Sequence, residues 1–142
     1  MPAIYEHRHR VQPEEIDELN HAGNVAYLTW MQSAALAHSA AQGWPAEAYH
    51  ALRAGWMVRS HEITYLNPAF LDDELVVETW VADFQKVTSL RRYRVLRPAD
   101  GRLLAEAATN WVFVNYDTRL PKRIPLEVSQ AFEVRRDEAS PG

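Results

Sequence analysis

A run of nineteen residues without proline or glycine, residues 24–42, limits the possible folds of this chain more than any other segment. The run is rich in alanine, leucine and methionine, so it can form a single helix about 28 Å long. Gly43 and Pro45 are expected to end this helix. The residues that we expect to face the core follow one stripe: Val25, Leu28, Met31 or Gln32, and Ala35. The second half is mostly alanine, and so slim a helix lets a sheet approach closely.

Most of the remaining chain is predicted to form strands. Residues 4–11 alternate between two faces, which is the period of a strand. Four further strands are expected over residues 56–65, 75–84, 88–96 and 103–116. Because the connections are short, we expect mostly antiparallel meander neighbours. One long helix on one antiparallel sheet places the chain in the α+β class.

The length of 142 residues fits one domain, which we assign to residues 1–135. Pro125 is expected to begin a short closing helix, because proline is favoured in a first helical turn. Residues 136–142 are expected to form a frayed C-terminal tail.

Composition excludes several kinds of chemistry. The chain has no cysteine, so disulfides, thiolate nucleophiles and cysteine metal sites are excluded. A net charge of −4 argues against a dedicated nucleic-acid binder. No segment is apolar enough to span a bilayer, and the first residues lack the pattern of a secretory signal. We therefore expect a soluble, cytoplasmic protein.

A polar turn stands immediately before the long helix. It brings together the carboxylate of Asp17, the imidazole of His21 and the carboxamide of Asn24. The first N–H groups of a helix have no partner within it, so they can bind an oxyanion beside such a turn. The combination suggests acyl transfer. The same residues also fit a structural interpretation, in which Asp17 is a turn or capping acid and Asn24 caps the helix.

The segment from Asp17 to Trp30 reads Asp-x-x-Asn-His-x-x-Asn-x-x-Tyr-Leu-x-Trp. Running into an alanine-rich helix and followed by strands, it resembles the hotdog-fold thioesterases of the 4-hydroxybenzoyl-CoA thioesterase type. Residues 63–75 and 117–125 are similar to later segments of that family, so the resemblance covers nearly the whole chain. It implies a curved antiparallel sheet of five strands wrapped around one long helix.

The resemblance also implies an activity, the hydrolysis of an acyl-CoA thioester to a free carboxylic acid and coenzyme A. Coenzyme A would enter as part of the substrate, and no separate cofactor is implied. Subunits of this family join their sheets edge to edge, with the acyl-CoA site at the interface. A homodimer or a dimer of dimers is therefore expected, with neither nucleic acid nor a membrane as partner.

Asp17 falls on the family's catalytic carboxylate position, where it would attack the thioester carbonyl or remove a proton from water. His21 matches a common histidine of the family and could orient Asp17, carry a proton or bind the acyl group. A backbone N–H of Asn24 or Val25 could polarise the carbonyl. Many relatives carry glutamate where this chain has Gln32, so a helix-glutamate mechanism is not expected, and Gln32 could instead position water.

Cationic side chains are the candidates for holding the phosphates of coenzyme A. They are Arg59, Lys86, Arg91, Arg92, Lys122 and Arg123. The resemblance favours Lys86 and Arg92, on the turn and strand where family members hold the nucleotide. The candidates for lining an acyl pocket are Tyr27, Trp30, Met31, Trp56 and Met57. Surface exposure or core packing is the competing interpretation for all of them.

Other functions stay open. An acyl-CoA-binding protein without turnover is suggested by the neutral Gln32. An acyl-carrier-protein thioesterase would need a basic surface at the pocket mouth, which the net charge of −4 disfavours. A metal centre that joins His21 to His7 and His9 is disfavoured because no recognised ligand spacing links them, so we expect no metal.

Overall fold

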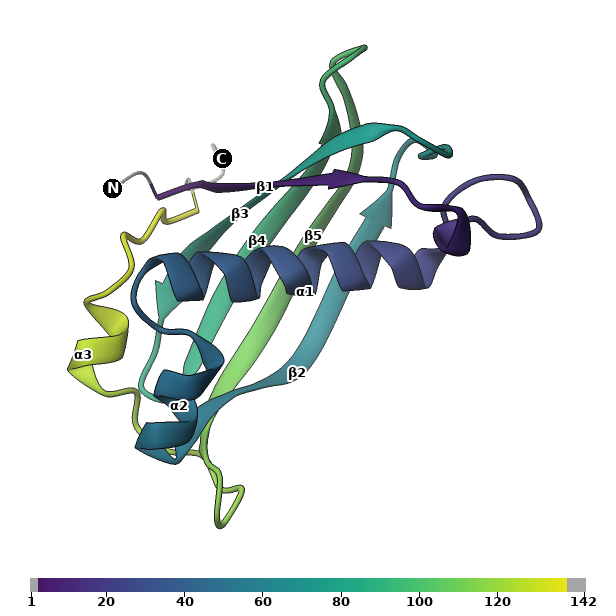
Figure 1. Ribbon diagram of the computed structural model, residues 1–142. Coiled ribbons are helices and arrows are strands. Elements are labelled where there is room, and N and C mark those ends of the chain that lie inside the picture. The colour runs from purple at the N-terminus through teal and green to yellow at the C-terminus, as the bar shows by residue number, and fades with distance from the viewer. Residues whose placement is uncertain (1–2, 138–142) are drawn as a thin grey trace.

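One sheet and one long helix make up most of the structure, a computed structural model that describes residues 3–137. The sheet curves around helix α1, Asn24–Ala41 (Figure 1). The five strands are β1 Tyr5–Arg10, β2 Ala54–Tyr65, β3 Glu74–Phe84, β4 Thr88–Arg97 and β5 Arg102–Asn115. All paired strands are antiparallel. The predicted α+β class and the curved five-stranded sheet are confirmed.

Helix α1 begins at Asn24 and ends at Ala41, within one residue of the predicted segment. Gly43 follows with a φ of 92°, a conformation that residues with a side chain rarely adopt. The glycine that was expected to stop the helix therefore does so. Pro45 then leads directly into the next helix.

The buried stripe of α1 differs from the predicted one. Its members recur every three to four residues, as in a helix packed on a sheet: Ala26, Tyr27, Trp30, Met31, Ala34, Ala35, His38 and Ser39. Val25 is 75% exposed, so the prediction was wrong for it, whereas of the alternatives Met31 and Gln32 the buried one is Met31. A helix turns one face to a sheet, and the face that carries Tyr27 and Trp30 buries more apolar surface.

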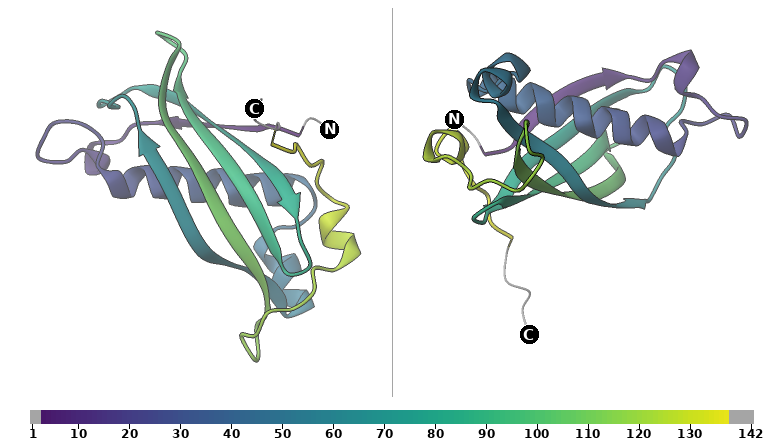
Figure 2. Two further views of the ribbon diagram at one scale, coloured as in Figure 1. Left: turned by 180° about the vertical axis from the view of Figure 1, so that it is seen from behind. Right: turned by 90° about the horizontal axis from the view of Figure 1, so that it is seen from below.

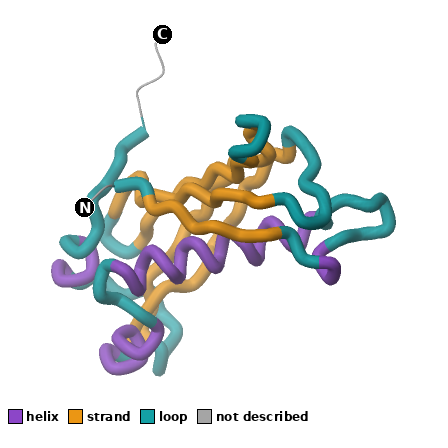
Figure 3. Tube along the Cα trace, turned by 45° about the horizontal axis from the view of Figure 1, so that its top comes forward, coloured by secondary structure: helices purple, strands orange, loops and turns teal. Residues whose placement is uncertain are grey.

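The strand order is β1-β3-β4-β5-β2, so β3, β4 and β5 form a meander that β2 does not join. β2 pairs with β5 from Ala54 opposite Asn115 onward. The predicted antiparallel meander is thus present in β3, β4 and β5, whereas residues 66–73 connect β2 to a strand that is not its neighbour. The Ala22 N–H donates to Ala69 O at 2.8 Å and ties this connection to the turn before α1. Two loops thus gather at the start of α1 (Figure 3).

Two short helices close the other end of the sheet (Figure 2). Helix α2, Ala46–Leu52, was not predicted, because Pro45 and so short a segment resemble a loop. Helix α3, Leu126–Ser129, follows Pro125 and confirms the predicted closing helix. A second, smaller core joins α2 and α3 to the sheet through these buried residues: Tyr49, Ala54, Phe113, Ile124 and Val128.

The chain after α3 returns to the sheet. Val134 forms a parallel bridge with Val81, and Asp137 bonds to Arg92 at 2.6 and 2.7 Å. We expected a frayed tail over residues 136–142. Asp137 is instead held on the sheet, and residues 138–142 lie outside the described residues. Between residues 3 and 137, no helix has the length and apolar character needed to cross a bilayer.

Candidate active site

The turn before α1 is a closed loop that presents the carboxylate of Asp17. The Asp17 N–H donates to His21 O at 2.9 Å, and the Asn20 N–H donates to Asp17 O at 3.1 Å. Asn20 has a φ of 65°, which asparagine tolerates better than most residues. Asp17 Oδ1 accepts from the Leu19 N–H at 2.9 Å, and the side chain is 35% exposed. The carboxylate is therefore fixed by local bonds and still open to solvent.

This carboxylate lies against the N-terminus of α1. Gly23 is the capping residue, and a Cβ placed on it would stand 3.9 Å from Asp17 Oδ2. The interpretation of Asn24 as the cap was wrong, because Gly23 holds that position. Within residues 3–137, the N–H groups of Asn24 and Val25 have no acceptor. A carboxylate thus stands beside two open donors at the positive end of a helix.

His21 lies beside Asp17 without a direct hydrogen bond. Its Nδ1 is 3.8 Å from Asp17 Oδ1 and 3.1 Å from Ala22 O. The first distance is too long for a hydrogen bond, and an Nδ1–H would donate to the Ala22 carbonyl. In this geometry His21 influences Asp17 through charge when protonated.

A partly buried hydrogen-bond network around Glu15, which was not predicted, ties the turn to the core. Glu15 accepts from Trp30 Nε1 at 2.6 Å and from the Gln12 N–H at 2.8 Å, and lies 2.7 Å from His9 Nε2. Burial raises the pKa of the Glu15 carboxyl, but these hydrogen bonds outweigh burial and lower it. Glu15 O also accepts from the Gly23 N–H at 3.0 Å. The capping-box spacing of Gln12 and Glu15 was the available signal.

The histidines considered as metal ligands do not come together. His9 bonds to Glu15, and His21 lies beside Asp17. Over residues 3–137, no group of three or more His, Cys, Asp or Glu side chains is placed to hold a metal ion.

The predicted substrate-binding residues lie in separate places. Tyr27 is buried in the main core, with its ring centroid 4.7 Å from that of Trp30. Gln32 is exposed on α1. Arg59 is exposed on β2, at an irregularity of the β2–β5 register. These three residues therefore have different environments, and their predicted contacts with substrate stay predictions.

Lys86 and Arg92 lie away from Asp17 of the same chain. Lys86 follows β3, and its carbonyl accepts from the Ile124 N–H at 2.9 Å beside the second core. Helix α1, about 27 Å long, separates that end of the sheet from Asp17. Arg92 points to the opposite face of β4 from Arg91 and bonds to Asp137. One chain by itself does not bring these cations to the carboxylate.

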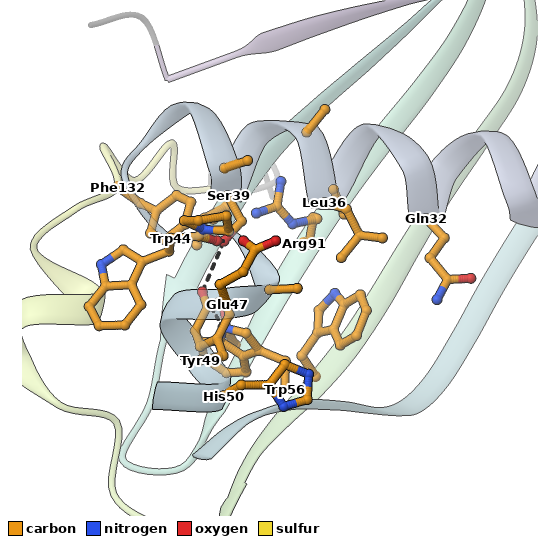
Figure 4. A pocket seen from close by; sticks show the side chains of 18 of the residues that line it. Gln32, Leu36, Ser39, Trp44, Glu47, Tyr49, His50, Trp56, Arg91 and Phe132 are labelled. Carbon is orange, nitrogen blue, oxygen red and sulfur yellow. Dashed lines mark hydrogen bonds between the residues drawn. The ribbon is translucent and has the colours of Figure 1, made fainter. Parts of the chain in front are cut away.

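A cavity of 490 Å³ lies beside the second half of α1 (Figure 4). Its wall is mainly apolar and includes Gln32 and the rings of Trp44, Trp56 and Trp111. Arg91 also lines it but is 6% exposed, so the competing interpretation as a solvated surface charge was wrong for this residue. Of the five candidates for an acyl pocket, Trp56 borders this cavity; Tyr27, Trp30 and Met31 are buried in the main core, and Met57 is exposed.

The sheet wrapped around a single helix, with a carboxylate at the helix N-terminus, defines a hotdog-fold protein. The chain belongs to the thioesterase-like superfamily, whose family model matches residues 11–132. The match includes the polar turn and four of the five strands. It confirms the predicted family and indicates thioester hydrolysis as the kind of chemistry.

Solved structures share this fold. A 1,4-dihydroxy-2-naphthoyl-CoA thioesterase from Synechocystis has a TM-score of 0.83 at 16% identity, over 90% of this chain and 94% of its own. A hypothetical protein from Thermus thermophilus has a TM-score of 0.83 at 25% identity, over 90% and 96%. A hypothetical protein from Staphylococcus aureus, solved in complex with CoA, has a TM-score of 0.84 at 20% identity, over 90% and 80%. A comparison with curated proteins finds no match.

Proposed function

We propose that this chain hydrolyses an acyl-CoA thioester to a free carboxylic acid and coenzyme A. The observation that carries the proposal is the exposed Asp17 carboxylate beside the open N–H groups of Asn24 and Val25. A thioester carbonyl held on either N–H would have its developing oxyanion stabilised by the helix N-terminus. Asp17 would attack the carbonyl carbon to form an acyl anhydride, which water then hydrolyses, or it would take the proton of the attacking water.

Coenzyme A is the proposed thiol because one protein of the same fold was solved with it and another is named as a CoA thioesterase. The Staphylococcus aureus protein was solved with CoA, and the Synechocystis protein is named as a CoA thioesterase. In this chain, Arg59, Lys86 and Arg123 are exposed cations that could bond to phosphates. A thioester on an acyl carrier protein is the alternative, and its turnover can be compared directly with that of the CoA ester.

The proposed functional unit is a homodimer. The two edges of the sheet differ, because β1 exposes Glu6, Arg8 and Arg10, whereas β2 exposes the apolar Met57 and Val58 beside Arg59, His61 and Glu62. An edge that exposes charges alone resists further pairing, whereas exposed apolar side chains on an unpaired edge favour association. A second copy joined along β2 would add its own cations to a site that one chain leaves without them. Sedimentation or light scattering would measure the state.

Release of free thiol from short, long and aromatic acyl-CoAs tests the proposed activity. Asp17→Asn keeps the size of the side chain and removes its charge, so we expect turnover to fall by at least about 100-fold. Glu18→Gln changes the neighbouring exposed acid and should retain turnover. Full turnover by Asp17→Asn would exclude the role of Asp17, and no release from any acyl-CoA by the unaltered chain would exclude the function.

Acyl-CoA binding without turnover is the second candidate, and Gln32 favours it. This side chain lines the cavity but carries no charge that could move a proton at pH 7. Saturable binding of an acyl-CoA together with no thiol release would favour this candidate over hydrolysis.

A further inference from the structure

Arg91 is a buried charge without a carboxylate partner. It lies on the inward face of β4 and is 6% exposed. Its Nη1 donates to His38 Nδ1 at 2.9 Å and to Thr79 Oγ1 at 3.1 Å. Both acceptors are neutral at pH 7, since burial, and then the charge of Arg91, lower the pKa of His38 to about 4. No ion pair joins Arg91 to a carboxylate of residues 3–137.

A buried cation without a counter-charge is unfavourable, and a guanidinium does not escape that cost by losing its proton. The usual solution within a protein is a paired carboxylate, and even the next residue, a partly exposed arginine, has one. Arg92 bonds to Asp137 through its Nε and Nη2 at 2.6 and 2.7 Å. Arg91 has the same two nitrogens, but among the described residues they have no acceptor.

These two nitrogens of Arg91 open to the cavity. Over residues 3–137, the side-chain polar atoms that are sealed from solvent and form no hydrogen bond are Trp111 Nε1 and Arg94 Nε, and the latter still lies 3.0 Å from Glu78 Oε1 in an ion pair. Arg91 Nε and Nη2 also lack a partner, but they are not sealed in this way. They therefore reach open space. Arg91 lines the cavity beside α1, which provides that space (Figure 4).

The neighbouring polar groups of the cavity wall satisfy one another. Ser39 Oγ donates to Trp44 O at 2.7 Å and lies 2.9 Å from Tyr49 Oη, to which Trp56 Nε1 donates at 3.1 Å. Glu47, the one acid of the wall, is exposed on α2 and forms no ion pair with Arg91. Apart from a cation–π contact with the Phe132 ring, 5.9 Å from the centroid, the charge of Arg91 is therefore unmatched, and Trp111 Nε1 is a second donor of this wall without a partner among the described residues.

We propose that this cavity binds an organic carboxylate with an apolar body, whose two oxygens accept from Nε and Nη2 of Arg91. Two parallel N–H groups match the two oxygens of a carboxylate. Leu36, Phe84 and Phe132 in the wall match a hydrocarbon or aromatic body. The volume of 490 Å³ lies within the roughly 300 to 1,000 Å³ of small-molecule sites. A phosphate would bring a second charge, whereas Arg91 is the one arginine or lysine among the residues that line this wall.

The carboxylate could come from two sources. His38, which bonds to Arg91, follows Asn24 by fourteen residues on α1, a distance of about 21 Å along the axis. A short acyl group held at Asn24 therefore does not reach Arg91 of the same chain. The ligand is either the distal carboxylate of a long acyl group or a separate carboxylic acid. The first source rests on the proposed function, whereas the binding itself does not.

Titration of the full chain with octanoate and 4-phenylbutyrate, and with the primary amide of each, tests the binding. Calorimetry measures the affinity, and the fluorescence of Trp44, Trp56 and Trp111 in the cavity wall gives a second readout. We expect one site per chain and an acid bound at least about tenfold more tightly than its amide, because a hydrogen-bonded charge pair replaces a neutral contact. Equal binding of acid and amide, or binding of neither, would overturn the proposal.

Arg91→Met should bind acid and amide alike, and Arg91→Lys should keep part of the preference. Arg94→Met is the matched control, because Arg94 lies on the outer face of the same strand and pairs with Glu78. It should keep the full preference. Retention of that preference by Arg91→Met would also overturn the proposal, and the comparison of acid with amide in the unaltered chain needs no variant.

Turnover of a long acyl-CoA with a distal carboxylate, against the plain acyl-CoA of the same length, separates the two sources. A preference for the former that Arg91→Met removes identifies the acyl group as the source. Equal turnover of both esters, together with tight binding of the free acids, identifies a separate ligand. If neither ester is hydrolysed, the proposed function fails while the carboxylate site is still decided by the titration.

Discussion

Two charged side chains lie beneath helix α1, and their surroundings are opposite. Glu15, near the start of the helix, receives hydrogen bonds from Trp30 and from a backbone N–H and contacts His9. Arg91, near the end of the helix, bonds to His38 and one hydroxyl, and both acceptors are neutral. The first charge is matched by donors of the chain, whereas the second is matched by no carboxylate among the described residues.

The difference teaches what each charge does. A satisfied carboxylate fixes the structure around it, and here it holds the turn that presents Asp17. An unmatched guanidinium in a cavity does not stabilise the fold, so it is better explained by binding. Removing the two charges should therefore change stability in opposite directions.

The largest effect is expected from Glu15→Ala. The substitution leaves Trp30 Nε1 and the Gln12 N–H without their acceptor, so the free energy of unfolding should fall by about 3–5 kcal/mol. Denaturant titration measures this change. Glu14→Ala, at the exposed neighbouring position, is the control and should have little effect. Equal losses in both variants would remove the distinction between the two ends of α1.

Arg91→Met should have the opposite sign. Replacing an uncompensated buried charge by an apolar side chain should raise the free energy of unfolding by about 1–2 kcal/mol, even though His38 loses a donor. Arg94→Met removes an ion pair at the surface and should cost at most about 1 kcal/mol. A fall of several kcal/mol in Arg91→Met would show that Arg91 is structural.

Glu15 and His38, near opposite ends of α1, should also affect the free energy of unfolding in different pH ranges. The pKa of His38 is lowered from 6.5 to about 4, so below pH 6.5 the unfolded chain takes up a proton that the folded chain refuses. The free energy of unfolding should therefore fall between pH 6.5 and 4, by about 3 kcal/mol. His38→Gln should flatten this slope, and His50→Gln, at an exposed position, should not. The folded structure lowers the pKa of Glu15 from 4.5. The stability that the ionised carboxylate contributes is therefore lost only below pH 4.5.

The smallest effects concern the two glycines that flank α1. Gly43 has a φ of 92°, so Gly43→Ala should cost about 1 kcal/mol. Gly23 has a φ of −76°, and a Cβ there would lie 3.6 Å from Asp17 Cβ, an ordinary contact. Gly23→Ala should therefore change stability by less than about 0.5 kcal/mol. A larger loss at Gly23 than at Gly43, measured by denaturation, would contradict this ranking.

Local patterns were sufficient for much of the fold. The alternation of residues 4–11, the uninterrupted run over residues 24–42 and the glycine after it depend on neighbours in sequence, so β1 and α1 were predicted closely. The buried stripe of α1 depends on which face meets the sheet. Val25 is apolar, yet it lies outside the face that Tyr27 and Trp30 fill, and no local pattern reports that choice.

The candidate site also has one part that local sequence predicted and one part that depends on tertiary structure. Asp17, His21, Asn24 and Val25 were predicted together because they are close in sequence, and the structure places them around one helix end. Lys86 and Arg92 were joined to them by resemblance, and one chain keeps them apart. Their proposed contribution therefore depends on a second copy.

Sequence by itself determined the polar turn, the helix that follows it and the kind of chemistry that a carboxylate beside open N–H groups can perform. Tertiary structure alone decided that β2 lies at an edge, that Glu15 meets Trp30, and that Arg91 is buried against His38, fifty-three residues away. The reason is physical: hydrogen bonding within a turn or helix depends on neighbours in the chain, whereas burial and charge pairing depend on which distant residues the sheet brings together.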